Sequence, residues 1–177
     1  MPNWLFTGKG DQGDSLLSNG EKLPKSSIEF EIIGSLDEVT ALIGLAICNL
    51  DDPEIVGIFK QVQQDLSFLM GIVAKAKNDA IAPFFNLSDA VENLEKGINY
   101  FGKDLENPKK MVFSGDSLAG AHIDVARTVI RRAERVSARM IEEKANIAEG
   151  VLQYLNRLSS LFYIIRLRVD KNRPVDK

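Results

Sequence analysis

The stretch VLQYLNRLSSLFYIIRLRV, residues 151–169, decides the fold class, because its apolar residues recur at alternating spacings of four and three. This spacing is typical of a helix that buries one stripe of its surface. Leu161, Ile164 and Leu167 add apolar surface on a second side of the same helix. We therefore predict a helix buried on two sides, either because it is central in a bundle or because it contacts another subunit.

Four segments upstream repeat the alternation of four and three, and they span residues 32–50, 55–76, 87–105 and 123–140. Asp52 and Pro53 supply a cap and a first-turn proline for the second helix, and Asp116 or Ser117 is the expected cap of the fourth. The sequence contains hardly any pattern typical of β-strands. A seven-residue rhythm favours shallow, left-handed crossings. The prediction is an all-α, antiparallel five-helix bundle over residues 28–170, preceded by a glycine-rich N-terminal loop over 1–27, in one domain spanning 1–177.

Composition narrows the classes of function. The 177 residues are 45% hydrophobic, enough for one domain with its own core, and 22 Lys and Arg against 25 Asp and Glu give a net charge of -3. Phosphate binding must therefore depend on local clusters of cations, and no nucleic-acid partner is expected. No secretory signal and no apolar window of roughly 18 residues is present, so we expect a cytoplasmic protein without a membrane span.

The single cysteine and the single histidine limit the chemistry further. Cys48 excludes a disulfide framework within the chain, and its apolar neighbours predict that it is buried. His122 has no second histidine or cysteine cluster to accompany it, so no protein-bound zinc site is predicted.

The N-terminal segment TGKGDQGDSLLSNG, residues 7–20, is a candidate phosphate loop. Its closely spaced glycines allow backbone N–H groups to approach phosphate oxygens, although it lacks the strand-to-helix context of a Walker A motif. Lys9 and Lys25 can neutralise phosphate charge, and Asp11 can hold Mg²⁺ or order the loop. The alternative is a surface tail rich in turn residues.

The segment RTVIRRAER, residues 127–135, carries a charged row. Arg127, Arg131 and Glu134 are separated by four and three, so they form one line beside the apolar row of the same helix. Asp37 occupies the same flanking position on the first helix, which predicts an ion pair between Asp37 and Arg127.

The arginine row has two interpretations. Arg132 and Arg135 extend its positive charge, and arginines that border a buried seam are suited to bind polyphosphate through bidentate contacts. The alternative is a solvated face with weak local ion pairs. Asn156 lies between Leu155 and Leu158 of the last helix, where its amide either satisfies a buried backbone group or contacts a sugar or base edge.

These segments together, in this order, resemble the PduO-type ATP:cob(I)alamin adenosyltransferases. The similarity covers nearly the whole chain and rests on TGKGDQGDSLL, Lys25, LDEV at 36–39, RTVIRRAER at 127–135 and YLNRLSS at 154–160. The resemblance implies a homotrimer of five-helix bundles with ATP bound between neighbouring subunits. It also implies transfer of the 5′-deoxyadenosyl group of ATP to Co(I) of a corrinoid, which yields adenosylcobalamin and triphosphate.

The resemblance carries site residues over position by position. Together with Asp11, the residues expected to bind ATP are Thr7, Gly8, Lys9, Gly10, Ser15, Lys25, Arg131, Arg132, Glu134, Arg135 and Asn156. The residues expected to be catalytic are Arg131, Arg127, Asp37 and Glu134. Cations such as Arg131 and Lys25, with Mg²⁺, would stabilise charge on the departing triphosphate.

The corrinoid side departs from the family pattern. Met111 stands where the family commonly has a phenylalanine, in an apolar pocket that removes the lower axial ligand of the corrinoid, and Phe113 is a candidate to take over that role. A flavin-dependent reductase and an adenosylcobalamin-dependent enzyme are the implied partners. The alternative function is an ATP-binding regulatory or cobalamin-delivery protein of the same fold with weak or no transferase activity.

Overall fold

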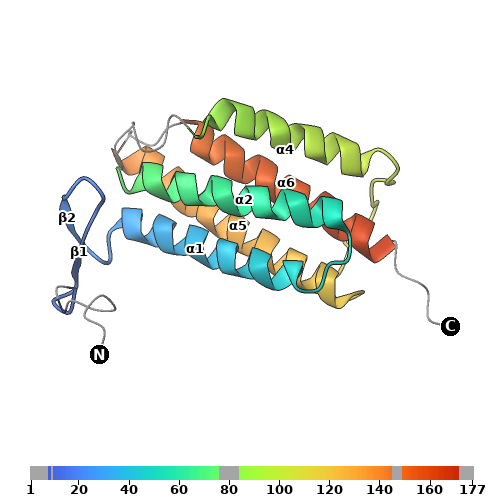
Figure 1. Ribbon diagram of the computed structural model, residues 1–177, viewed down its shortest axis with the longest axis horizontal. Helices are drawn as coiled ribbons and strands as arrows, with labels where there is room; N and C mark the ends of the chain where they lie inside the picture. Colours follow the sequence, from blue (N-terminus) through green and yellow to red (C-terminus); the bar gives the residue numbers. More distant parts are fainter. Residues whose placement is uncertain (1–7, 9, 76–83, 145–148, 172–177) are drawn as a thin grey trace.

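The computed structural model describes residues 8, 10–75, 84–144 and 149–171, and in this part of the chain it contains five helices and one small hairpin (Figure 1). The helices lie side by side along one common direction. This architecture confirms the all-α prediction and the position of every expected helix. Their bounds are α1 (Ile28–Ile47), α2 (Pro53–Val73), α4 (Leu87–Gly102), α5 (Leu118–Lys144) and α6 (Glu149–Lys171).

The helix boundaries follow from local capping. Asp52 accepts hydrogen bonds from the backbone N–H groups of Glu54 and Ile55, at 2.9 Å and 3.3 Å, where α2 begins at Pro53. These bonds satisfy donors that have no partner inside the helix. Ser117 caps α5 in the same way, since its Oγ accepts the backbone N–H of Gly120 at 2.8 Å. Of the two cap residues expected from sequence, Ser117 is therefore the one used.

The two apolar sides of α6 are both covered by helices of the same chain. One side packs against α5 and the other against α4. Leu161, from the second apolar row, is 1% exposed, and a Cβ atom on Gly97 of α4 would lie only 3.2 Å from its Cδ1. Glycine thus lets α4 approach α6 closely. Of the two explanations for the wide apolar face, a central position in the bundle is confirmed.

The N-terminal region contains a short antiparallel hairpin that the sequence scarcely signalled. Strand β1 (Asp14–Leu16) pairs with β2 (Lys22–Pro24). Each strand has only three residues, which is too few to show the alternation of apolar and polar residues that identifies a strand in a sequence. The backbone N–H of Ser18 donates to the carbonyl of Ala74 at 2.9 Å, and the side chain of Leu17 is buried. The hairpin is therefore fixed to the end of α2.

One expectation from composition was wrong. Cys48 is exposed, because α1 ends at Ile47 and the buried stripe does not continue past the helix terminus. Among the described helices, none combines the length and the apolar character needed to cross a bilayer.

Candidate active site

Glu134 joins the two segments that carry the site motifs. Its Oε2 lies 2.5 Å from Nη1 of Arg131, and its Oε1 accepts a hydrogen bond of 3.0 Å from the side-chain amide of Asn156 on α6. The side chain of Glu134 is 13% exposed and that of Arg131 is 45% exposed. The carboxylate therefore fixes the guanidinium while leaving part of it open to an anion. We call these three residues, Arg131, Glu134 and Asn156, the arginine–glutamate cluster.

A second arginine extends the cluster to α4. Arg157 donates from Nη1 to Oδ1 of Asn156 and from Nε to Glu95, each at 2.8 Å. The Asn156 amide is thus held on both its oxygen and its nitrogen by side chains, rather than by a buried backbone group. The sequence analysis did not select Arg157, although it lies inside the motif YLNRLSS.

The other arginines of α5 point elsewhere. Arg132 pairs with Glu38 of α1, and Arg139 pairs with Glu31 of α1 at 2.7 Å. Exposed pairs of this kind contribute only about 0.2–1 kcal/mol to folding. Arg135 is exposed, and within the described part of the chain it makes no ion pair. The charged segment therefore divides between the α5/α6 side, which holds the cluster, and the α5/α1 side.

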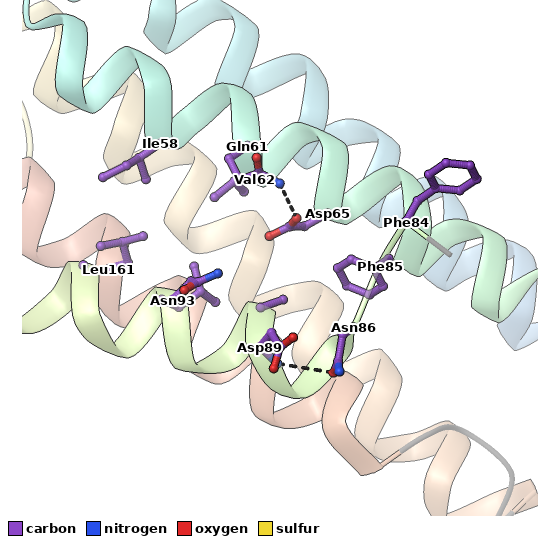
Figure 2. A pocket seen from close by; sticks show the side chains of 13 residues that line it. Ile58, Gln61, Val62, Asp65, Phe84, Phe85, Asn86, Asp89, Asn93 and Leu161 are labelled. Carbon is purple, nitrogen blue, oxygen red and sulfur yellow. Dashed lines mark hydrogen bonds between the residues drawn. The ribbon is translucent and has the colours of Figure 1, made fainter. Parts of the chain in front are cut away.

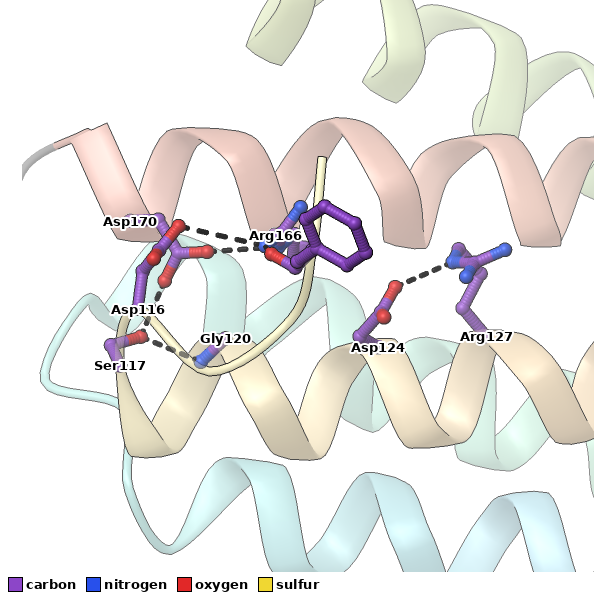
Figure 3. A network of polar contacts seen from close by, with 8 residues as sticks. Asp116, Ser117, Gly120, Asp124, Arg127, Arg166 and Asp170 are labelled. Atoms are coloured by element: carbon purple, nitrogen blue, oxygen red, sulfur yellow. Dashed lines mark hydrogen bonds and ion pairs between the residues drawn. The ribbon is translucent and has the colours of Figure 1, made fainter. Parts of the chain in front are cut away.

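The ion pair predicted between Asp37 and Arg127 is not formed within the chain. Arg127 instead pairs through Nε with Asp124 at 2.7 Å (Figure 3). Asp37 is exposed on α1. Asp124 lies three residues before Arg127 on the same helix, where side chains are neighbours, so it reaches the guanidinium without crossing to another helix.

The glycine-rich segment folds into successive tight turns. Gly8 and Gly13 have φ values of 70° and 85°, which glycine adopts at little cost. The backbone N–H of Lys25 donates to the carbonyl of Gly13 at 2.8 Å, and a Cβ atom on Gly10 would lie 3.1 Å from Lys25 Nζ. The missing side chain of Gly10 thus leaves room for the Lys25 ammonium beside the turns. Asp11 closes the first turn by donating its backbone N–H to the Gly8 carbonyl at 3.3 Å.

The remaining loop residues are partly placed. Ser15 is half-buried and pairs with Leu23 across the hairpin, whereas Thr7 and Lys9 lie outside the described residues. Glu21 forms an ion pair of 2.6 Å with Lys75, which ties the hairpin to the end of α2. In the part of the chain that the structure describes, no hydrogen bond or ion pair joins the hairpin to the arginine–glutamate cluster. Within one chain, the described residues Gly8, Gly10 and Lys25 therefore lie apart from the arginine–glutamate cluster.

The loop that connects α4 to α5 carries the expected corrinoid residues. Met111 and Phe113 are 82% and 75% exposed, and they line an open hollow together with residues 108–110, Val112 and Asp116. Arg166 of α6 contacts the backbone of this loop (Figure 3). The sequence analysis did not select Arg166. A usable signal exists, because an arginine beside Ile165 on a helix apolar on two sides has little access to water.

A separate cavity of about 290 Å³ lies between α2 and α4 (Figure 2). Asp65 lines it, is 7% exposed, and accepts hydrogen bonds from Gln61 at 3.0 Å and from the hydroxyl of Tyr154 at 2.9 Å. Burial raises the pKa of Asp65, against the opposing effect of these two bonds. Burial and the neighbouring carboxylate also raise the pKa of Tyr154. Of the described residues expected to bind ATP or a corrinoid, none lines this cavity.

The sequence matches the family model described as cobalamin adenosyltransferase over residues 5–169. The chain belongs to the cobalamin adenosyltransferase family. It is 33% identical over 167 residues to a corrinoid adenosyltransferase of Bacillus subtilis, covering 90% of this chain and 82% of that protein. It is 32% identical over 164 residues to a cobalamin adenosyltransferase of Cupriavidus metallidurans, covering 91% of this chain and 85% of that protein.

A solved structure of this family shares the fold. A phenylalanine-to-alanine variant of the PduO-type ATP:corrinoid adenosyltransferase of Lactobacillus reuteri, complexed with cobalamin and ATP, superposes with a TM-score of 0.85. The alignment covers 94% of this chain and 93% of that chain at 24% sequence identity. At this identity the likeness confirms the five-helix fold of the family.

Proposed function

We propose that this protein is an ATP:corrinoid adenosyltransferase. The observation that carries the proposal is the arginine–glutamate cluster, which joins the motifs RTVIRRAER and YLNRLSS in a chain that belongs to the cobalamin adenosyltransferase family. In the reaction, Co(I) uses its electron pair to attack the 5′ carbon of ATP. A cobalt–carbon bond forms, the bond from that carbon to the triphosphate oxygen breaks, and triphosphate leaves. Because Co(I) is itself a nucleophile, the protein needs no activated serine or cysteine.

The protein's contribution is position and charge. Arg131 is held by Glu134 and is 45% exposed, so it is oriented in advance and accessible to a phosphate oxygen. Arg132, Arg135 and Lys25 are further cations that we assign to the triphosphate. Glu134 keeps Arg131 and Asn156 in register with each other.

A magnesium ion fits this site. Mg²⁺ in nucleotide sites is bound through one or two carboxylates together with substrate phosphates. Asp11 is exposed at the turns formed by Gly8 and Gly10, where it can supply one carboxylate. Bound there, Mg²⁺ would neutralise charge on the triphosphate.

We propose that the complete ATP site forms between subunits of a homotrimer. Within one chain the hairpin lies at the end of α2 and has no polar contact to the arginine–glutamate cluster among the described residues. A hairpin from a neighbouring subunit would bring Gly8, Gly10 and Lys25 to that cluster. We place the pairing of Asp37 with Arg127 at the same boundary, because Asp37 is exposed and does not pair with Arg127 in its own chain.

Electron supply and use of the product require other proteins. We propose that an external flavin-dependent reductase delivers the electron that makes Co(I), that an adenosylcobalamin-dependent enzyme takes the product, and that the reaction takes place in the cytoplasm. On the corrinoid side, Met111 and Phe113 are the exposed apolar residues that would contact the ring.

A second candidate function is motivated by Met111, which replaces the family's aromatic residue. In this alternative, the chain is an ATP-binding regulatory or cobalamin-delivery protein that keeps the nucleotide site but does not transfer adenosyl groups efficiently.

An anaerobic assay with ATP, Mg²⁺ and chemically reduced cobalamin separates the two functions. The transferase is expected to form the cobalt–carbon bond, which is followed by the change in the cobalamin absorption spectrum. ATP binding without adenosylcobalamin formation would contradict the transferase and support the regulatory protein. Omitting Mg²⁺ in a parallel reaction tests the metal requirement.

A further inference from the structure

The apolar side chains of the loop of residues 111–116 contribute little to holding it in place, since two of the three are exposed and the third, Val112, is only half-buried. Met111 is 82% exposed and Phe113 is 75% exposed, so neither side chain packs into the core of the bundle. A loop without buried side chains keeps one conformation only if its backbone or polar groups are bound elsewhere. Those bonds come from α6.

Arg166 of α6 is the residue that reaches the loop. Its side chain is 1% exposed, and its Nη2 donates a hydrogen bond to the backbone carbonyl of Phe113. The same guanidinium forms an ion pair with Asp170, with Nε 2.8 Å from Oδ2, although the geometry of this contact is not that of a hydrogen bond. A second carboxylate oxygen, Oδ2 of Asp116, lies 3.6 Å from Nη2. Figure 3 shows the loop passing directly over Arg166.

The network also holds the end of the loop. Asp170 accepts a hydrogen bond of 2.6 Å from Ser117 Oγ, and Ser117 caps α5 through the N–H of Gly120. One carboxylate on α6 therefore holds the first turn of α5 and contacts the arginine that binds the Phe113 carbonyl. The segment from Phe113 to Ser117 is attached to α6 at both ends.

We propose that Arg166 is a positioning residue for corrinoid binding, which rests on the proposed function of this site. A bond to the Phe113 carbonyl fixes the backbone at that residue, and with it the direction in which the neighbouring apolar side chains leave the backbone. Fixing the loop before the corrinoid arrives lowers the entropy lost on binding. Arginine is suited to this task because it presents several donors in a planar group that can serve a carbonyl and two carboxylates together.

The test is a comparison of Arg166→Met with Arg166→Lys in the anaerobic assay. Methionine keeps apolar volume but removes all hydrogen-bond donors. We expect the KM for the corrinoid to rise about tenfold, which corresponds to roughly 1.4 kcal/mol of lost binding. The KM for ATP is expected to stay within about twofold, because the arginine–glutamate cluster is untouched. Lysine keeps a cation for Asp170 and is expected to restore part of the loss.

Arg168→Met is the matched control. Arg168 lies on the same helix and contacts the ring of Phe101 rather than the loop, so both KM values should stay unchanged. A corrinoid KM that is unchanged in Arg166→Met, or a rise of both KM values together, overturns the proposal. If Arg166→Met does not fold, Asp116→Asn decides, because Asp116 is 68% exposed and its loss is expected to raise the corrinoid KM alone, by a few-fold.

Hydrogen exchange at the end of the loop separates this inference from the proposed function. The amides of Gly120 and Ala121, which donate to Ser117 at 2.8 Å and 2.9 Å, should exchange faster in Arg166→Met than in the unmodified protein, whether or not the protein transfers adenosyl groups. If the unmodified protein is inactive and the exchange still rises, the transferase assignment fails and the attachment of the loop stands. Unchanged exchange in an active protein overturns the role of Arg166.

Discussion

The arginine–glutamate cluster and the loop of residues 111–116 differ in what holds them. The cluster lies on two packed helices, and side-chain contacts fix each member, with Glu134 only 13% exposed between Arg131 and Asn156. The loop exposes its apolar side chains and is held through its backbone by Arg166. In the proposed function, the triphosphate would meet groups that are already oriented, whereas the corrinoid would cover side chains that are exposed in the free protein.

The two regions also depend on different physical effects. Charge stabilisation requires groups that do not reorganise during the reaction. Side chains on packed helices that hold one another through direct contacts meet this requirement. Apolar contact scales with the area removed from water, at roughly 25 cal/mol per Å², and tolerates changes of shape. Substitutions in the cluster should therefore affect turnover, and substitutions in the loop should affect corrinoid binding.

The largest expected effect is that of Arg131→Ala. Removing one oriented charge-stabilising group typically lowers kcat by about 100- to 1,000-fold. The helix should be retained, because the Arg131 side chain is 45% exposed and alanine favours helices. The anaerobic assay measures kcat, and circular dichroism measures the helix content.

Arg139→Ala is the control for that experiment. Arg139 lies on the same helix, is exposed, and pairs with Glu31 on the α1 side rather than with Glu134. The kcat of the Arg139→Ala variant should stay within about twofold of that of the unmodified protein. Comparable losses in both variants would mean that the whole charged row, rather than the cluster, supports turnover. Lost helicity in Arg131→Ala would point to a structural role.

A smaller effect is expected from truncating the loop side chains. Met111→Ala and Phe113→Ala each remove exposed apolar area that the corrinoid would cover, so the corrinoid KM should rise about tenfold, which corresponds to roughly 1.4 kcal/mol. Because both side chains are mostly exposed in the free protein, the midpoint of urea unfolding should not change.

The ranking of the two loop variants sharpens the comparison. A larger rise for Phe113→Ala would mean that Phe113 replaces the family's aromatic residue, and a larger rise for Met111→Ala would mean that methionine retains the role. If both leave the corrinoid KM unchanged while the KM for ATP rises, the assignment of this loop to the corrinoid is wrong.

The sequence predicted the helix-borne region better than the loop, for physical reasons. Arg131 and Glu134 fall on one line because helical periodicity fixes their relation, and the neighbouring apolar row fixes where that line lies. Asp37 and Arg127 do not pair within the chain, because spacing cannot decide between an acid on another helix and Asp124 three residues away. The choice depends on distances that only packing sets.

Helical periodicity could not predict the contacts of the loop of residues 111–116. Arg166 and Asp170 are separated by four, which predicts a pair along one helix, but no periodicity relates α6 to the carbonyl of Phe113, 53 residues earlier in the chain. The hairpin was missed for a related cause, since strands of three residues carry too little pattern. Interactions through backbone atoms depend on the path of the chain and do not require a particular residue type.

The last prediction concerns stability and expects no loss of turnover: it tests the attachment of α6 beside the cluster, two residues before Asn156. Tyr154→Phe removes the hydrogen bond of 2.9 Å to Asp65 and leaves a buried carboxylate oxygen without that donor, which should lower the free energy of unfolding by about 1–3 kcal/mol. Urea unfolding followed by circular dichroism measures it. Tyr163→Phe on the same helix is the control, since Tyr163 is half-buried and makes no side-chain hydrogen bond among the described residues.

The loss caused by Tyr154→Phe should depend on pH. Burial raises the pKa of Asp65 in the folded protein above its usual value of 3.8, so the stability from its protonated form is fully present below pH 3.8 and is lost as pH rises through the raised pKa. The Tyr154 hydroxyl lowers this pKa, and removing it raises the pKa further. Below the raised pKa of the unmodified protein, Asp65 is protonated in both folded proteins, so the destabilisation should grow only as pH rises from that pKa to the still higher pKa of the variant. An equal loss across that window would show that the hydroxyl does not stabilise the charge on Asp65, and that α6 is held there by packing alone.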